Sequence, residues 1–149
     1  MAEQSSQRDE EEPFDGPVRP SPIDSLAYVV IGAAQKVHRV LGPGFTENIY
    51  QAALERELVQ RKIPFESQKE LQVFYEGYLC GMYRADMLVY GRLILELKAV
   101  AQLAKEHKAQ TKSYMKASGL PAALLLNFGA TSLEVWRLNQ SESMKSAES

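Results

Sequence analysis

Asp86, Glu96 and Lys98 are the residues of this chain whose types and spacing are best suited to chemistry. Asp86 lies in an apolar segment that ends at Tyr90-Gly91-Arg92, and the other two follow in the next apolar segment. Two carboxylates about 4 Å apart repel each other by roughly 4 kcal/mol at an effective dielectric near 20, so a divalent cation between them is favoured. Carboxylate oxygens suit Mg²⁺ or Mn²⁺, and the segment offers none of the soft ligands that zinc or copper prefer.

Whether Asp86 and Glu96 can meet depends on the length of the turn between the two segments. Residues that face each other in an antiparallel pair share one face of the sheet, and the faces alternate with every residue. A three-residue loop over 90–92 pairs Val89 with Leu93, and counting outward then brings Asp86 opposite Glu96. A two-residue loop would turn the carboxylates to different faces. The metal-site hypothesis therefore requires the odd-length loop.

The same register gives this pair of strands one charged face and one apolar face. Arg84 falls opposite Lys98, beside the two carboxylates. The apolar face carries residues that we expect in the core, namely Ala85, Met87, Val89, Leu95 and Leu97. Alternatively, the charged face is only a solvated surface, because alternating charges and cross-strand ion pairs keep a strand soluble. Spacing alone leaves both interpretations open.

The surrounding segments predict an α/β (α+β) fold of helices and strands. Ser21-Pro22-Ile23-Asp24 has the N-cap, proline and first-turn acid of a helix start. Periodicity predicts helices to residue 41 and over about 46–62 and 100–117, and strands over 71–75, 78–90, 93–99, 122–128 and 133–138. The inward positions of the first two helices are Ile23, Leu26, Val30, Ala33, Val37, Val40, Ile49, Ala53, Leu54 and Leu58.

Composition indicates one domain between two tails. A chain of 149 residues with 45% hydrophobic content can bury a single core. Residues 1–20 hold six acids and two bases, a net charge of 2 − 6 = −4, and we expect a disordered acidic tail there. Residues 139–149 are also polar and predicted to be disordered, which leaves 21–138 as the domain. Subtracting −4 from the formal −2 leaves +2 for residues 21–149, which permits phosphate contact without requiring it.

Cysteine content and hydropathy indicate a cytoplasmic protein. Cys80 is the only cysteine, which excludes an internal disulfide and a cysteine-based zinc site. The apolar runs fall far short of the ~20 residues that a membrane helix needs, and the first residues lack the pattern of a secretory signal. We therefore expect no membrane partner.

Gly44-Phe45-Thr46-Glu47-Asn48-Ile49-Tyr50 resembles the signature of the GxxExxY proteins, a branch of the PD-(D/E)XK nuclease superfamily. The resemblance continues in chain order through Tyr83-Arg84-Ala85-Asp86, Leu95 to Val100, Ala109-Gln110 with Tyr114, and Leu126-Asn127-Phe128-Gly129. It implies a restriction-endonuclease-like αβββαβ core, with a central mixed sheet flanked by helices. The proline that names the superfamily is missing from the position before Ala85-Asp86.

The resemblance also implies a reaction, the hydrolysis of nucleic-acid phosphodiester bonds with Mg²⁺ or Mn²⁺. Asp86, Glu96 and the backbone carbonyl of Leu97 would hold the metal. Glu47 would ligate it directly or through water, and Lys98 would orient or deprotonate the attacking water. Alternatively, Glu47 only complements a helix N-terminus.

Gln110 and Tyr114 lie four residues apart, which puts both on one helical face. The resemblance makes them, with Arg84, the substrate-binding residues, whereas the alternative is a satisfied polar pair between helix and sheet. At the level of function, the alternative to a nuclease is a non-catalytic module that keeps the fold and binds nucleic acid or a protein. The sequence leaves DNA and RNA equally open, and the small size leaves room for a homodimer that holds a duplex.

Overall fold

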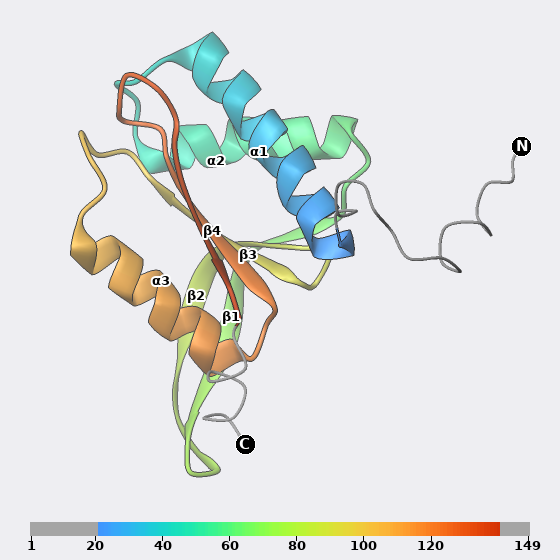
Figure 1. Ribbon diagram of the computed structural model, residues 1–149, viewed down its shortest axis with the longest axis vertical. Helices are drawn as coiled ribbons and strands as arrows, with labels where there is room; N and C mark the ends of the chain where they lie inside the picture. The colour runs from blue at the N-terminus through green and yellow to red at the C-terminus, as the bar shows by residue number, and fades with distance from the viewer. Residues whose placement is uncertain (1–20, 141–149) are drawn as a thin grey trace, which may run out of the picture.

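A five-stranded mixed sheet in the order β1-β2-β3-β4-β5 forms the centre of the molecule (Figure 1). The computed structural model describes residues 21–140, so the disorder predicted for 1–20 and 139–149 lies outside the described residues except at 139 and 140, where β5 continues to Asn139. β3 and β4 are parallel and the other neighbours antiparallel, which confirms the predicted mixed sheet and the order ααβββαββ. The elements are α1 Pro22–Leu41, α2 Glu47–Gln60, β1 Phe65–Tyr75, β2 Tyr78–Val89, β3 Leu93–Lys98, α3 Lys105–Ser118, β4 Ala122–Asn127 and β5 Glu134–Asn139.

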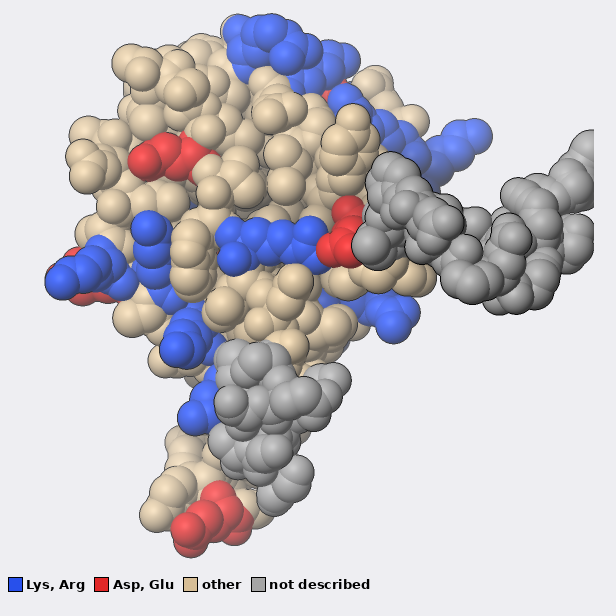
Figure 2. All heavy atoms as spheres, in the orientation of Figure 1, with Lys and Arg blue, Asp and Glu red and all other residues tan. Residues whose placement is uncertain are grey.

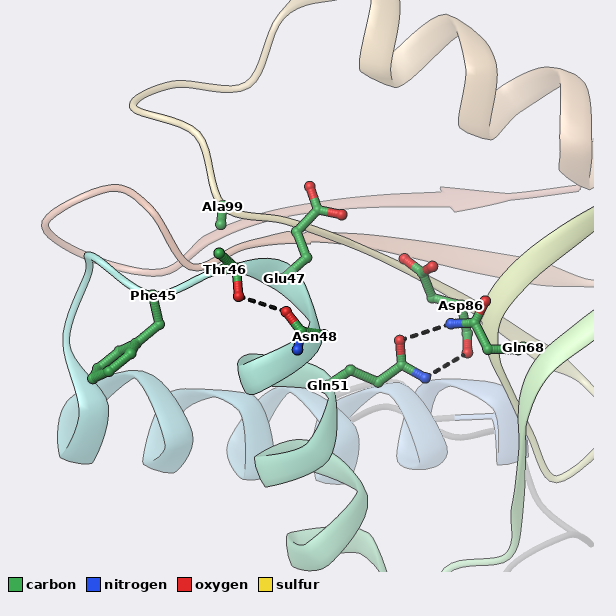
Figure 3. Close-up of a pocket in the computed structure, with 8 residues that line it drawn as sticks. All are labelled: Phe45, Thr46, Glu47, Asn48, Gln51, Gln68, Asp86 and Ala99. Atoms are coloured by element: carbon green, nitrogen blue, oxygen red, sulfur yellow. Dashed lines mark hydrogen bonds between the residues drawn. The ribbon is translucent and has the colours of Figure 1, made fainter.

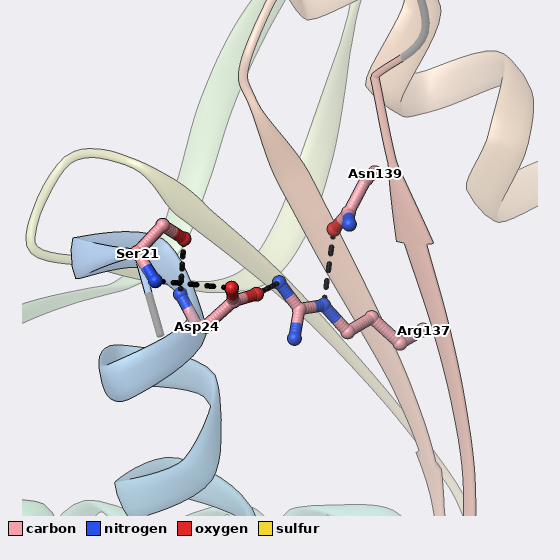
Figure 4. Close-up of polar contacts among 4 residues, drawn as sticks. All are labelled: Ser21, Asp24, Arg137 and Asn139. Atoms are coloured by element: carbon pink, nitrogen blue, oxygen red, sulfur yellow. Dashed lines mark hydrogen bonds and ion pairs between the residues drawn. The ribbon is translucent and has the colours of Figure 1, made fainter. Parts of the chain in front are cut away.

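α1 begins where the sequence predicts, with a reciprocal capping box. The Asp24 amide donates to Ser21 Oγ and the Ser21 amide to Asp24 Oδ2, both at 3.1 Å. Arg137 of β5 forms an ion pair with Asp24 and donates through Nε to Asn139 at 3.0 Å (Figure 4). The start of α1 is therefore tied to the last strand of the sheet.

The buried faces of the two N-terminal helices differ from the prediction at two positions. Val40 is 70% exposed, because the buried line drifts with the 3.6-residue period and passes through Val37 and His38 instead. In α2, Ile49 is 41% exposed and the neighbouring Tyr50 is fully buried. The buried line of α2 therefore runs at four-residue steps, through Tyr50, Leu54 and Leu58.

The two faces of the sheet are covered by different helices. α1 and α2 pack on one face against Met87, Val89 and the odd-numbered residues of β3, and α3 packs on the other against Leu88, Ile94 and Ala123. Ala85 was expected beside Met87 and Val89, but it lies in the α3-side core. The strand changes face at the intervening residue, Asp86, which is not paired with Gln68 of β1 although the register is the same on both sides. Gln68 has a left-handed φ of 50°, so neither strand is regular at this point.

Two other boundaries differ from the periodicity. β1 begins at Phe65, six residues before the predicted 71, and the β1–β2 hairpin extends beyond the rest of the sheet (Figure 1). α3 begins at Lys105 rather than at 100, because residues 99–104 form a loop fixed by β4 and β5. Within 21–140, the structure contains no helix of the length and apolar character that crossing a membrane would need.

Candidate active site

The turn between β2 and β3 has the odd length that the metal-site hypothesis requires. Val89 pairs with Leu93 across the loop, and the Arg92 amide donates to the Val89 carbonyl at 3.0 Å. Tyr90 and Gly91 complete the turn with left-handed φ angles of 58° and 67°. The register of the prediction is therefore confirmed.

The paired ladder stops just before the two carboxylates. Met87 and Leu95 form its last pair, and Asp86 and Glu96 would be the next. Asp86 Oδ2 instead accepts a hydrogen bond from the Leu97 amide at 2.7 Å. The Asp86 amide in turn donates to the Glu96 carboxylate. Each acid therefore accepts a hydrogen bond from a backbone N–H of the other strand. These two hydrogen bonds hold both carboxyl groups at the point where the strands separate.

Glu96 is the buried carboxylate of the site. Only 8% of the residue is exposed, and its Oε2 atom has no hydrogen-bond partner. Burial raises the pKa of Glu96 to about 8, and the negative charge of Asp86 adds to the rise. A buried acceptor without a donor is unfavourable, so this atom is suited to receive a cation or a water molecule that a cation brings.

The charges of Lys98 and Glu47 shift the pKa of Glu96 in opposite directions. The Lys98 ammonium lowers the pKa of Glu96, whereas the Glu47 charge raises it by a smaller amount. The Lys98 carbonyl accepts from the Phe128 amide at 2.8 Å, which fixes the end of β3. Glu47 is exposed at the first position of α2, where it also complements the helix N-terminus. The structure thus brings both residues within electrostatic reach of Glu96.

Glu47 and Asp86 line an open cleft of about 580 Å³ between α2, β1 and β2 (Figure 3). Gln51 donates to the Asp86 carbonyl and Gln68 donates to Gln51 Oε1, each at 3.0 Å. Both carboxylates project to the same side of this amide chain (Figure 3). The amides hold the backbone of Asp86, and sequence reasoning missed them because neither lies in a pattern that predicts chemistry.

Tyr114 contributes to the apolar wall around Glu96. Its ring stacks on Tyr83 with centroids 3.8 Å apart, and Tyr83 donates to the Tyr114 carbonyl at 3.1 Å. The raised pKa of Tyr114 arises from burial and then from the charges of Glu96 and Asp86. Tyr83 was not predicted as a site residue, although it lies two residues before Ala85 and shares its face.

The other two predicted substrate contacts lie further out. Gln110 is exposed on α3. Arg84 is also exposed and forms an ion pair with Glu70 of β1 at 3.2 Å. The predicted position opposite Lys98 lies beyond the paired ladder, which ends at Met87 and Leu95.

In the segment from Gly44 to Tyr50, the structure explains why a glycine and a tyrosine occupy the two ends. Gly44 has a φ of 121°, which a side chain would strain. Tyr50 is fully buried, stacks on Phe128 at 4.8 Å and accepts from the Phe45 amide at 3.2 Å. Its hydroxyl also donates to the carbonyl of Gly42. Together these contacts place Glu47 at the mouth of the cleft.

The loop that leaves the site is clamped by buried Asn127. Asn127 Oδ1 accepts from the Val100 amide and Nδ2 donates to the Val100 carbonyl, both at 2.9 Å. Nδ2 also donates to Glu134 at 2.7 Å, and Glu134 accepts from the Leu103 amide at 2.9 Å. Gly129 lies against the same loop, since a Cβ there would come within 2.6 Å of the Ala99 carbonyl carbon. Neither Asn127 nor Gly129 was predicted to serve the site.

The donor set fits a hard divalent cation in part. Among residues 21–140, no three His, Cys, Asp or Glu side chains come together closely enough to form a complete metal cage. Two adjacent carboxylates, one of them with a buried oxygen that has no partner, nevertheless suit a Mg²⁺-like ion that keeps several waters.

Comparisons with known proteins give a family for this geometry. No curated protein matches the chain in sequence. The crystal structure of SSO0001 is similar in fold, with 16% identity and a TM-score of 0.50 over 67% of this chain, and the chain spans 53% of that protein. The alkaline exonuclease LHK-Exo from Laribacter hongkongensis is 9% identical, with a TM-score of 0.48, 87% of this chain covered and 76% of the exonuclease. The model of the PD-(D/E)XK nuclease superfamily matches residues 24–138, so the chain belongs to that superfamily and has its restriction-endonuclease-like fold.

Proposed function

We propose that the protein is a nuclease that hydrolyses phosphodiester bonds of DNA or RNA with Mg²⁺ or Mn²⁺. The observation that carries the proposal is the buried Glu96 carboxylate, which keeps an oxygen without a partner beside Asp86. A structural carboxylate at this depth would be expected to fill its hydrogen-bonding capacity from the protein. Membership of a nuclease superfamily supports the same conclusion.

Each residue of the site has a role in this proposal. Asp86, Glu96 and the carbonyl of Leu97 would hold the metal, and Glu47 would ligate it from α2 directly or through water. A metal held there would supply positive charge to stabilise the phosphate in the transition state. Lys98 would orient the attacking water or, as a neutral amine, take its proton. As an ammonium it would stabilise the charged transition state and offset the charge of the two acids.

We also propose that the chain belongs to the GxxExxY branch of the superfamily. The support is the arrangement of Gly44, Glu47 and Tyr50, since the glycine and the buried tyrosine both fix where α2 begins. In this proposal Glu47 takes part in catalysis as a ligand of the metal, directly or through water. Gln110, Tyr114 and Arg84 remain proposed substrate contacts, and the homodimer remains a prediction that light scattering can test.

The test is cleavage of end-labelled duplex DNA, single-stranded DNA and single-stranded RNA with Mg²⁺, Mn²⁺ or EDTA. We expect cleavage by the wild type with metal only, and a loss of at least about 100-fold in Asp86→Asn and Lys98→Met, because preorganised charge at the reacting phosphate supplies a large share of the rate. Glu66→Gln is the matched control, since it removes an exposed acid of β1 whose ion pair is with Lys69, outside the site.

The outcomes separate the nuclease from the alternative module. Metal-independent cleavage, or full activity in Asp86→Asn, would contradict the proposed mechanism. Binding of nucleic acid without cleavage of any of the three substrates would favour the non-catalytic module, which keeps the fold for recognition alone.

A further inference from the structure

α3 carries a row of lysines that the proposed reaction does not use. Lys105, Lys108, Lys112 and Lys116 stand on the helix with a single acid, Glu106, which gives α3 a net charge of 4 − 1 = +3. At 3.6 residues per turn, the four-residue spacing of the last three lysines keeps them in one row, and Lys105 falls beside them. Figure 2 shows blue side chains gathered over the length of α3.

The row lies on one flank of the helix, away from the candidate active site. Thr111 and Met115 define the buried side of α3. Helical geometry places the lysines on one side of that line and Gln110 and Tyr114 on the other. Tyr114 turns toward Glu96, so the lysines face in the other direction, toward β5, where Lys108 Nζ lies 6.0 Å from the ring centroid of Trp136.

Three of the four lysines, Lys105, Lys112 and Lys116, have no ion pair within the described part of the chain, whereas the charge of Lys108 lowers the pKa of Glu134. In residues 21–140, the ion pairs involve Lys36, Arg61, Lys69, Arg84 and Arg137, and none of the four lysines of α3. Like charges four residues apart destabilise a helix by a few tenths of a kcal/mol per pair. A polyanion bound on this flank would attract each lysine and offset the repulsion between them.

We propose that this lysine row binds the phosphate backbone of a nucleic acid, as a surface separate from the catalytic cleft. The choice of a nucleic acid as the polyanion rests on the proposed function. From Lys105 to Lys116 the helix rises by about 16 Å, which matches about five nucleotides of one strand at 3.4 Å each. The row thus gives a strand several contacts that do not depend on base sequence.

The composition of this flank argues against the other classes of polyanionic partner. On the solvent side, the residues next to the row are Ala109, Ser113 and Ala117, and none is a large apolar side chain that would insert into a membrane surface. On the β5 side Trp136 lies beside Lys108, but it is partly buried. A protein interface would also need an apolar centre, which these small residues do not supply. Nucleic acid needs neither, because phosphate contacts alone provide non-specific affinity.

The test compares two triple variants of the full chain. Lys105→Gln, Lys112→Gln and Lys116→Gln together remove the row while sparing Lys108, which contacts Trp136. Arg39→Gln, Arg56→Gln and Lys62→Gln remove the same charge from exposed positions on α1, on α2 and just after α2. Glutamine has nearly the helix propensity of lysine, so circular dichroism should show both variants folded.

Binding is measured by fluorescence anisotropy with labelled 20-base-pair DNA and with 20-nucleotide DNA and RNA, in EDTA to prevent cleavage. We expect the α3 variant to bind at least tenfold more weakly at low salt. The slope of log K against log salt should become shallower by about 2 to 3, because each lost contact removes about 0.7 to 0.9. The control variant should stay within about twofold of the wild type.

Three results would overturn the inference. These are unchanged affinity and slope in the α3 variant, equal weakening in both variants, or lysine-dependent binding only to vesicles that contain 30% phosphatidylserine. Failure of the proposed nuclease is distinct from these, because an inactive wild type would still show lysine-dependent binding. An active wild type whose α3 variant binds normally would refute the lysine row alone.

Discussion

At the scale of single residues, the site depends on how far Glu96 is removed from water. Glu96 is buried, whereas Asp86 is only half-buried and its Oδ2 atom accepts a hydrogen bond from the Leu97 amide. The pKa of Glu96 near 8 means that the folded protein without metal carries this group mostly protonated at neutral pH. A cation that binds there must displace the proton, so metal affinity should increase with pH.

The raised pKa of Glu96 predicts how stability depends on pH. Between the ordinary value of 4.5 and about 8, the folded protein holds this proton more tightly than the unfolded chain, so stability falls as pH rises through this window. The contribution of Glu96 has a limit of about 1.4 kcal/mol per pH unit. Glu96→Gln should remove this slope, and urea unfolding in EDTA from pH 5 to pH 8.5 measures it.

The informative quantity is the difference between the variant and the wild type, since all other titrating groups are shared. Glu96→Gln should gain stability relative to the wild type as pH rises. Glu70→Gln, which changes an exposed glutamate, should follow the wild-type curve. Parallel curves for Glu96→Gln and the wild type would mean that Glu96 is not held protonated by the fold.

Gly129 gives a second prediction at this scale. In Gly129→Ala the new methyl group meets backbone atoms of Ala99 and Val100, which cannot move aside as a side chain can. We expect a loss of about 1–3 kcal/mol in unfolding free energy, the usual cost of overpacking. Gly81→Ala is the matched control, because a Cβ there meets nothing within 4 Å, and it should change stability by less than about 0.5 kcal/mol. Equal effects of the two substitutions would contradict the close approach.

At the scale of elements, the loop of residues 99–104 connects the catalytic strand to α3. Its path is set by two side chains, Asn127 at the end of β4 and Glu134 at the start of β5. Asn127 forms hydrogen bonds with the backbone of Val100, and Glu134 accepts one from the Leu103 amide. These residues follow β3 by about thirty positions, so the clamp exists only after β4 has paired in parallel with β3. The end of β3, and Lys98 with it, is therefore fixed by the whole sheet.

Asn127→Asp tests this clamp. The carboxylate can still accept from the amides of Val100 and Gly129, but it cannot donate to the Val100 carbonyl and it places a charge beside Glu134. We expect a loss of about 3 kcal/mol, since a buried group loses its partner and a charge is buried. Urea unfolding at pH 7 measures the change.

The double variant Asn127→Asp with Glu134→Gln provides the control for that prediction. The side-chain amide that Glu134→Gln introduces can donate to the new carboxylate, while its oxygen still accepts from the Leu103 amide. We expect part of the lost stability to return. A double variant that is less stable than either single variant would show that the two side chains do not act as a pair.

At the scale of the whole molecule, the proposed metal links two separate parts of the fold. Asp86 and Glu96 come from the β2–β3 hairpin, whereas Glu47 comes from α2, and a bound ion would hold them together. A ligand that binds only the folded state stabilises it by about 2.7 kcal/mol at 100 times its dissociation constant. For a domain of this size, that corresponds to a rise of roughly 10 °C in melting temperature.

Thermal unfolding with and without Mn²⁺ measures this effect. The wild type should show the rise and Asp86→Asn should not, because the variant lacks one of the two charges that draw the ion in. Mn²⁺ should leave the Glu70→Gln control as stabilised as the wild type. An equal rise in Asp86→Asn would place the metal elsewhere on the molecule.

The sequence alone was sufficient for the features that depend on neighbouring residues. The capping box at Ser21, the three-residue turn at Gly91 and the register of Val89 with Leu93 follow from local dihedral preferences and from the two-residue period of a strand. Whereas the mixed sheet was implied by the family resemblance, the order of the elements follows from hydrophobic periodicity in the same way. So does the adjacency of Asp86 and Glu96, once the turn length is chosen.

Tertiary structure decided what depends on partners distant in the chain. The irregular backbone at Gln68 and Asp86 puts Ala85 in the other core, which an ideal strand does not predict, and the pairing of β1 with β2 puts Arg84 opposite Glu70. The roles of Tyr83, Asn127 and Gly129 appear only when β4 and α3 pack beside β3. Asp86 and Glu96 therefore remain the centre of the site that the sequence indicated, and the burial that gives Glu96 its chemistry is a property of the assembled fold.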